Sequence, residues 1–400
     1  MSNSVLTPTQ VTRKALMILH QKLNFVGSIN RQYDDSFAKS GAKIGDTLKI
    51  RLPNQYTVRT GALIAAQDTA EESVELKVQT QKGVDMNFTS DDLTLDLDDF
   101  SERILDPAMS VLAANVESDA MSMYKNVYNS VWNGASAATY NKLLDNKVLL
   151  QRSLTPADGR TANLDPLTMV DIVKDTKTLF QDQKQISTAF KEGYMGRAAG
   201  FDFMENTLWP AHTRGAANGS YTTDTRTSAL ATDGTAYSSI TVASGSGSWV
   251  VGDVFTISGV KSVHPESKVS TGVDQQFVIT AASSGGGGTI SFSPSIILGG
   301  AKQNVTTSLT SATASITVLG SASTAVNTSL LYHKNAFAFA TADLIMPKGV
   351  DFSAREVLDG ISMRIVRQYD ITNDKFPCRI DILYGYKAIR PQLASRYHNN

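Results

Sequence analysis

The residues of this 400-residue chain whose types could support chemistry are few and far apart. Its five histidines follow neither the HExxH pattern nor a Cys/His spacing typical of zinc sites: His20, His212, His264, His333 and His398. We therefore expect surface or structural histidines. The one cysteine, Cys378, lies in a strand pattern without the helix N-terminus that lowers the pKa of a thiol, and no GxSxG elbow presents a serine. No nucleophile is predicted.

Two further stretches resemble binding motifs but lack essential parts. Residues 283–288 are rich in glycine, yet no Gly-Lys-Ser/Thr follows and a strand pattern comes next, which predicts a hairpin loop rather than a phosphate cradle. A set of acidic residues could pair as acid and base or bind calcium, but it lacks EF-hand spacing: Asp91, Asp92, Asp96, Asp98 and Asp99. Charge that complements a helix N-terminus explains the set more simply. The sequence predicts no catalytic residue, cofactor or metal.

Composition narrows the functional classes. The chain has 37 basic and 38 acidic residues and a formal charge of −1, so we expect no net attraction for nucleic acid or an anionic membrane. The apolar run of residues 15–19 is too short for a signal-peptide core, and no run approaches the roughly 20 apolar residues that span a bilayer. One cysteine cannot form an internal disulfide. These features favour a soluble protein of an intracellular compartment.

The first part of the chain predicts a helix and then a long hairpin. Thr7, Pro8 and Gln10 form a capping box, and an apolar stripe at helical spacing follows. From Gly41 the period becomes two, in three runs: residues 48–52, 74–78 and 84–88. Between the first two runs, residues 54–72 are polar, bend around Gly61 and have no core of their own. We expect this hairpin to contact a neighbouring molecule.

Two helices are predicted next. The apolar positions of residues 100–132 fall on one face, so we expect a spine helix, about 25 to 30 residues and roughly 40 Å long, in which Pro107 starts or kinks the regular part. A second helix is expected from Asp165, as the cap, to about Gln185.

From about Gly215 the composition shifts to Ser, Thr, Gly and Ala between short strand-forming runs. These runs are residues 239–242, 254–258, 276–281, 289–293 and 315–319. They predict a small β-barrel or sandwich that ends near Thr328 and is inserted, because material of the earlier kind resumes after it.

The end of the chain predicts a sheet. Residues 362–391 form two antiparallel strands around a turn at residues 371–374, and Phe337 and Phe339 alternate with alanines in a further strand of that sheet. The whole is of the α+β class. We expect an N-terminal arm over residues 1–43, an extended hairpin over 44–90, a spine helix with a mixed domain over 91–214, an inserted all-β domain over 215–328, and a return to the mixed domain over 329–400.

The order of several segments resembles the major capsid proteins of tailed bacteriophages, with the Hong Kong 97-type fold, and in particular podophage coat proteins that carry an insertion domain. The segments are KIGDTLKIRLP, SDDLTLDLDDF, LAANVE, EGYMGRAAGFDFMEN, WVVGDVFTISGVKSVHPES, NTSLLYHKNAFAFAT and RQYDITNDKFPCRIDILYGYKAIRPQLASR. The resemblance implies a Hong Kong 97-like capsid fold with an inserted β-barrel domain, and a shell protein that is not an enzyme.

The resemblance also implies partners. Copies of the chain would form pentamers and hexamers of an icosahedral head, assembled in the bacterial host cytoplasm and located in the virion. Because fewer than about fifty residues precede the hairpin, a separate scaffolding protein is implied. A portal protein and enclosed double-stranded DNA, bound without sequence specificity, complete the expected set.

Two groups of residues are candidate sites under this reading. Glycines at the hairpin base are expected hinges: Gly41, Gly45 and Gly83. Charged residues in the first loop of the insertion are candidate contacts between subunits, with solvated surface charge as the alternative: Asp224, Arg226 and Asp233.

Two other functions stay open at this stage. The Ser/Thr/Gly-rich insertion is compatible with a bacterial surface or adhesive module, which the absence of a secretion signal disfavours. A hydrolase with an unrecognised site, involving His212 or Asp91, is the third interpretation.

Overall fold

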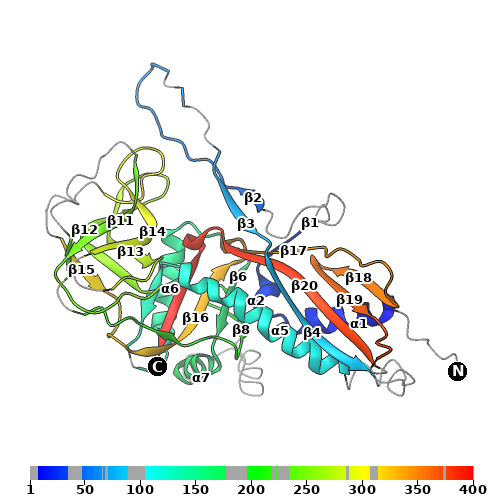
Figure 1. Ribbon diagram of the computed structural model, residues 1–400. Coiled ribbons are helices and arrows are strands. Elements are labelled where there is room, and N and C mark those ends of the chain that lie inside the picture. The colour runs from blue at the N-terminus through cyan, green and yellow to red at the C-terminus, as the bar shows by residue number, and fades with distance from the viewer. Residues whose placement is uncertain are drawn as a thin grey trace. The chain divides into compact units, whose positions relative to one another are not determined.

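The computed structural model describes residues 8–34, 47–64, 66–67, 71–88, 104–134, 136–176, 196–218, 221–223, 234–284, 288–306, 314–372 and 375–399. The chain forms two compact units (Figure 1). Unit 1 comprises Met1–Ile50, Ser73–Ser122 and Phe337–Ile389, and unit 2 comprises Arg51–Glu72, Met123–Ala336 and Arg390–Asn400.

Unit 1 is built on a six-stranded sheet. Its order is β1 (Asn30–Asp34), β17 (Phe337–Ala342), β20 (Phe376–Ala388), β19 (Ile361–Arg367) and β18 (Phe352–Leu358), with β4 (Thr80–Phe88) also paired to β20. The expected closing hairpin is confirmed, since β19 and β20 pair antiparallel with Ile365 opposite Ile380. The expected strand at Phe337 and Phe339 is also confirmed as β17, which pairs antiparallel with β20.

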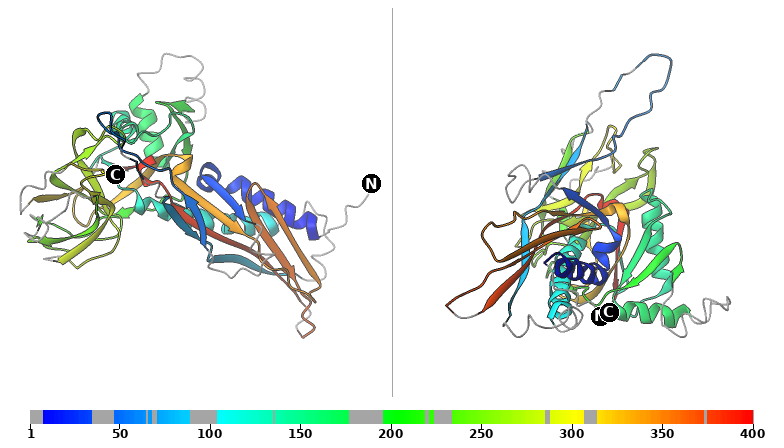
Figure 2. Two further views of the ribbon diagram at one scale, coloured as in Figure 1. Left: turned by 90° about the horizontal axis from the view of Figure 1, so that it is seen from above. Right: turned by 90° about the vertical axis from the view of Figure 1, so that its right-hand side faces the viewer.

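Among the residues that the structure describes, unit 1 has the helices α1 (Pro8–Lys22), α2 (Phe25–Ser28) and α5 (Asp106–Met121). The expected first helix is confirmed as α1, and its apolar stripe is buried. Figure 2 shows α1 and α5 side by side, and α1 packs against β18 and β19. The Phe25 ring lies 5.7 Å from the ring of Phe337, so α2 covers the aromatic face of β17.

The expected spine helix is wrong at its C-terminal end. α5 ends at Met121, a 3₁₀ turn follows (η3, Ser122–Asn126), and the chain then enters β5 (Ser130–Trp132). The Ser122 hydroxyl donates to the Asp119 carbonyl at 2.6 Å, which tightens the last turn. Of the buried apolar residues beyond Met121, Met123 lies in η3 and Val131 in β5, which pairs with β21, so tertiary pairing overrides the helical period.

The seven-stranded sheet of unit 2 packs against helices α6 (Tyr140–Arg152) and α7 (Pro166–Thr176). Its order is β5, β21 (Ala394–Asn399), β16 (Ala325–His333), β6 (Arg160–Leu164), β8 (Phe201–Glu205) and β7 (Arg197–Ala198), with β9 (His212–Thr213) paired to β16. Side chains of these helices form a core with this sheet that includes Leu150, Ile172 and Phe203. α7 begins as expected, because the Asp165 carboxylate accepts from the Leu167 N–H at 3.1 Å. Its expected end near residue 185 lies outside the described residues.

The insertion is a closed barrel, which confirms the expected all-β module. The strand order is β10 (Tyr221–Thr223), β11 (Ala236–Ala243), β14 (Gly288–Ile297), β13 (Ser270–Ile279), β12 (Val254–Val263) and β15 (Ser315–Val318). Its core is aromatic: the Phe255 ring lies 5.7 Å from Trp249 and 5.6 Å from Phe277, which lies 5.1 Å from Phe292. The last barrel strand ends at Val318, and Thr328 lies in β16.

A two-stranded ribbon, β2 (Thr47–Arg51) with β3 (Ser73–Lys77), precedes and follows the long hairpin loop. Two short 3₁₀ turns complete the described elements: η5 (Lys334–Ala336) and η6 (Pro391–Leu393). The elements thus leave two regions for closer attention, the hairpin loop and the place where the barrel meets the sheet of unit 2.

Candidate functional site

The described residues contain no group of three or more His, Cys, Asp or Glu side chains that could hold a metal ion. No helix among them is long and apolar enough to cross a bilayer. Cys378 lies in β20 and is buried, and burial raises the pKa of its thiol to about 12. This cysteine is therefore a protonated core residue at neutral pH.

The hairpin loop, residues Arg51–Glu72, exposes aliphatic side chains. We call it the reaching loop. Val58, Leu63 and Ile64 are 96%, 89% and 87% exposed. Burying one such side chain contributes about 1.5 to 3 kcal/mol. Three of them on one loop form a surface that would gain several kcal/mol from a partner.

The described residues of the reaching loop form hydrogen bonds with one another. The Thr57 N–H donates to Gln67 Oε1 at 2.9 Å, and Gln67 Nε2 donates to the Thr57 carbonyl at 2.6 Å. The Arg59 guanidinium donates to the carbonyls of Gly61 and, at 3.0 Å, Leu63. Gly61 has φ +101°, which confirms the expected bend and suits glycine. The loop therefore presents its aliphatic residues on a defined backbone.

At its base the reaching loop meets the barrel. The Lys302 ammonium pairs with the Glu72 carboxylate, and Arg51 pairs with Glu71 at 3.1 Å. All four side chains are well exposed, so solvent screening leaves these pairs little stabilising effect. The two ion pairs therefore contribute little to the position of the loop.

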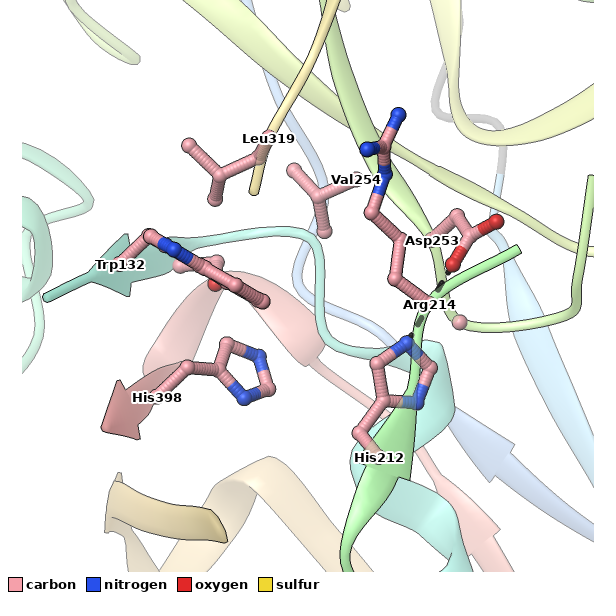
Figure 3. A pocket seen from close by; sticks show the side chains of 9 residues that line it. Trp132, His212, Arg214, Asp253, Val254, Leu319 and His398 are labelled. Atoms are coloured by element: carbon pink, nitrogen blue, oxygen red, sulfur yellow. Dashed lines mark hydrogen bonds and ion pairs between the residues drawn. The ribbon is translucent and has the colours of Figure 1, made fainter. Parts of the chain in front are cut away.

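The second region is a buried polar cluster within unit 2, at the junction between the barrel and the seven-stranded sheet. We call it the polar seam: Tyr124, Trp132, His212, Arg214, Asp253, Arg396 and His398. Figure 3 shows most of these side chains around a small pocket, with Leu319 and Val254 of the barrel facing Trp132. The residues come from five elements or their flanks: η3, β5, β9, β12 and β21.

Asp253 is the carboxylate of the polar seam. It is buried just before β12, and it accepts from the backbone N–H groups of Val250 at 2.9 Å and Gly215 at 3.2 Å. Nε2 of His212 lies 3.4 Å from Asp253 Oδ1, and the Tyr124 hydroxyl lies 3.2 Å from His212 Nδ1. These contacts run from Tyr124 through His212 to Asp253, and they thus link η3 and β9 to the start of the barrel.

Arg396 brings a positive charge into the same place. Its side chain is fully buried on β21, and Nη1 donates to the Gly252 carbonyl at 2.8 Å. Burial lowers the pKa of Arg396 to about 10, while Tyr124 and Asp253 oppose that change. A guanidinium with this pKa remains charged at neutral pH, so the polar seam holds a buried cation that Asp253 only partly compensates.

His398 lies two residues further along β21. Its ring centroid is 5.4 Å from that of Trp132 and 5.8 Å from that of His212, and its Nδ1 is 3.3 Å from the Thr328 hydroxyl. Burial, then the charge of Arg396 and then His212, lowers the pKa of His398 well below 6.5. At neutral pH this imidazole is uncharged.

Two further contacts fasten the barrel to the sheet. Gln276 of β13 and Ser130 of β5 exchange two hydrogen bonds of 2.8 Å, between the amide side chain and the Ser130 backbone. Arg214 donates to the carbonyls of Gly320 at 2.7 Å and Ala217 at 2.5 Å. Burial lowers the pKa of Arg214, while the charge of Asp253 raises it.

The pocket in the polar seam has a volume of about 10 Å³, near the minimum for one water molecule. Nε2 of His212 and Oδ1 of Asp253 are 3.4 Å apart, and a pocket of this size leaves no room for a substrate beside them. The hydrogen bonds of the polar seam join the barrel to the seven-stranded sheet.

The structure tests few of the residues that the sequence singled out. Asp224, Arg226 and Asp233 lie outside the described residues, as do Gly41, Gly45 and the acidic set of residues 91–99. Gly83 lies inside β4, opposite Asp381 of β20, where an added Cβ would be 2.5 Å from Asp381 Oδ1. Its role as a hinge stays a prediction.

Sequence reasoning missed most of the polar seam and the exposed residues of the reaching loop. His212 was expected to be structural or on the surface, and the structure places it against Asp253, 41 positions away. No short motif contains this pair. The aliphatic residues of the reaching loop had a usable signal, because Val58, Leu63 and Ile64 interrupt a polar stretch in which they can find no internal core.

A comparison with known protein families identifies the family of this chain. The family model of the P22 coat protein, gene protein 5, matches residues 28–395. The chain belongs to the P22 coat protein family, and it is a bacteriophage capsid protein. The resemblance expected from the sequence is confirmed, as is the Hong Kong 97-like α+β fold with an inserted barrel.

Several solved structures are similar to the whole chain. One from Mycobacterium phage Che8 is 10% identical with a TM-score of 0.45, and covers 94% of this chain and 90% of its own. The capsid structure of cyanophage P-SCSP1u is 9% identical with a TM-score of 0.44, over 93% and 86%. The head structure of Helicobacter pylori bacteriophage KHP40 is 10% identical with a TM-score of 0.43, over 89% and 84%. No curated protein matches the sequence.

Proposed function

We propose that this chain is the major capsid protein that assembles, with a scaffolding protein, into the icosahedral head enclosing the phage genome. The observation that carries the proposal is the reaching loop, whose Val58, Leu63 and Ile64 are almost fully exposed on an ordered backbone. In a shell, each copy would place these side chains on the next copy and receive those of another. Such head-to-tail contacts close into rings, here pentamers and hexamers.

The other partners follow from the family and the composition. A scaffolding protein would guide assembly, in the bacterial host cytoplasm, and a portal protein would occupy one vertex. The formal charge of −1 supports a wall that encloses double-stranded DNA without gripping it, because strong non-specific binding needs an excess of basic residues. In this role the protein has no catalytic step and resides in the virion.

The candidate residues from the sequence keep their proposed roles within this function. Gly41, Gly45 and Gly83 would adjust the hairpin base between pentamers and hexamers. Asp224, Arg226 and Asp233 would contact a neighbouring subunit through the first loop of the insertion. The family match favours this function over a bacterial surface module.

The test removes the aliphatic surface of the reaching loop. Leu63→Ser with Ile64→Ser keeps the Arg59 bond to the Leu63 carbonyl, which is a backbone group. We expect the double variant to stay folded and monomeric, with shell yield reduced at least about tenfold, because each contact loses several kcal/mol. The yield is measured by light scattering after size exclusion and by negative-stain microscopy, with and without the scaffolding protein.

A matched control makes the same kind of substitution, aliphatic to serine, at an exposed residue outside the reaching loop. Val269 is also an exposed aliphatic residue, 65% exposed in a barrel turn. Val269→Ser should assemble like the unmodified protein. Wild-type yields of shells from the double variant would refute the role of the reaching loop.

A further inference from the structure

We propose that the polar seam is an acid-sensitive joint: it fastens the inserted barrel to the seven-stranded sheet at neutral pH and releases the barrel when His398 is protonated. The proposal concerns unit 2 alone and does not depend on the proposed function. It rests on which groups meet at the joint and on a barrel core whose described buried residues include no acidic or histidine side chain.

Several polar contacts join the barrel to the sheet. From the barrel side, Asp253 reaches His212, the Gly252 carbonyl accepts from Arg396, and Gln276 clasps the backbone of Ser130. Apolar side chains also meet there, with Leu319 and Val254 facing Trp132 (Figure 3). Polar contacts of this kind are weakened when a buried charge is added beside them, although the amide and backbone groups of Gln276 and Ser130 do not themselves ionise.

The charges around His398 are unbalanced. Its own strand supplies Arg396, β9 supplies His212, and β5 and β16 supply the uncharged Trp132 and Thr328. The other titratable groups of the seam and its rim are Tyr124 and Lys125 from η3, Arg214 after β9, Tyr221 from β10 and Asp253 before β12. Asp253 is the one carboxylate among them, and it already faces His212 and two backbone N–H groups.

Protonation of His398 therefore adds a third buried cation to Arg396 and Arg214, against one carboxylate. The direction of the pH effect follows from the lowered pKa of His398 in the folded state. Neutral His398 contributes its full stabilisation above the usual pKa of 6.5, and this contribution is lost as the pH falls from 6.5 through the lower pKa of the folded protein. Acid should weaken the joint.

The barrel itself should survive the same change. Its core consists of aliphatic and aromatic side chains, among them Trp249, Phe255, Phe277 and Phe292, and the strands close on one another. The buried members of that core include no acidic or histidine side chain. The joint should therefore open before the barrel unfolds.

The three tryptophans of the chain separate these events. Trp132 lies in the polar seam, Trp249 in the barrel core, and Trp209 donates to Asn163 at 2.7 Å on the sheet side. In full-length protein, Trp209→Phe with Trp249→Phe leaves Trp132 as the reporter, and Trp132→Phe with Trp209→Phe leaves Trp249. Each is titrated from about pH 8 to pH 4.5, the range that spans histidine ionisation.

We expect the emission of Trp132 to fall at least about twofold and shift to the red with a midpoint below 6.5, because a protonated imidazole quenches it and water enters. The emission of Trp249 should stay constant over that interval. His398→Gln, which keeps a neutral polar group near Thr328, should abolish the change at Trp132. His264→Gln, in a turn of the barrel away from the seam, should leave it intact.

Hydrogen exchange on the unmodified chain gives the same answer without substitutions. After correction for intrinsic rates, acid should expose the N–H groups of Ser130 and Gly215, bonded to Gln276 and Asp253, before that of Ile279, bonded to the Asp253 carbonyl inside the barrel. Any one of three results would refute the proposal of an acid-sensitive joint: a Trp132 emission that does not change with pH, an unchanged transition in His398→Gln, or coincident loss of the Trp132 and Trp249 signals.

Discussion

At the scale of single residues, some buried polar groups are packed so closely that one added side chain would disturb them. Asp381 is fully buried in β20, and its carboxylate accepts from Arg364 and Arg379, each at 2.7 Å. Gly83 lies directly opposite, so the absence of a side chain at this position makes room for the ion pairs. The glycine is needed here for close approach.

We predict that Gly83→Ala destabilises unit 1 by about 1 to 3 kcal/mol, because an added methyl group would collide with Asp381 and with the backbone at Ile380. Urea unfolding followed by circular dichroism measures the loss. Gly27→Ala in α2 is the control, since a Cβ there has no neighbour within 4 Å. Equal midpoints for the two variants would contradict this explanation.

The two candidate regions differ in how much of each could be predicted from the sequence. The bend at Gly61 and the lack of a core in the reaching loop could be predicted from local pattern alone. The polar seam could not, because Trp132, His212, Asp253 and His398 are brought together by strand pairing between distant segments. The spacing of these four residues in the sequence does not indicate that they meet.

At the scale of elements, a buried carboxylate ties α5 to the N-terminal helices. Glu117 of α5 is 1% exposed, and its two oxygens accept from the N–H groups of Phe25 and Val26, the latter at 3.2 Å. These are the first two residues of α2, whose amide groups have no partner within the helix. The carboxylate therefore positions α2 over β17.

We predict that Glu117→Gln costs about 1 to 3 kcal/mol, because the amide loses the charge and replaces one acceptor by a donor that faces an N–H group. Hydrogen exchange should show faster exchange at Phe25 and Val26 than at the amides of β19. Glu266→Gln, at an exposed turn of the barrel, should change neither stability nor exchange. Unchanged exchange in the Glu117 variant would count against this anchoring.

The elements themselves were largely predictable where one pattern ran undisturbed. The alternation in β17, β19 and β20 and the runs inside the barrel gave the strands correctly. The continuous apolar face over residues 100–132 predicted one long helix. That prediction was wrong after Met121, where the chain forms a 3₁₀ turn and then a strand. α6 was not predicted, although Thr139 caps its first turn and Leu143 and Leu150 share its buried face.

At the scale of the whole molecule, a capsid subunit must be stable alone and yet keep surface for its neighbours. The two compact units satisfy the first requirement with separate sheets and cores. We propose that the reaching loop meets the second, since Val58, Leu63 and Ile64 lie in solvent. The insertion was visible in the sequence as a change of composition, whereas its polar joint to the sheet was not.

The most direct measurement is a cryo-electron microscopy reconstruction of particles assembled from this chain. We predict that Val58, Leu63 and Ile64 are buried against an adjacent copy in every subunit of the shell. A shell in which these three side chains remain in solvent, while other surfaces hold the copies together, would contradict the account.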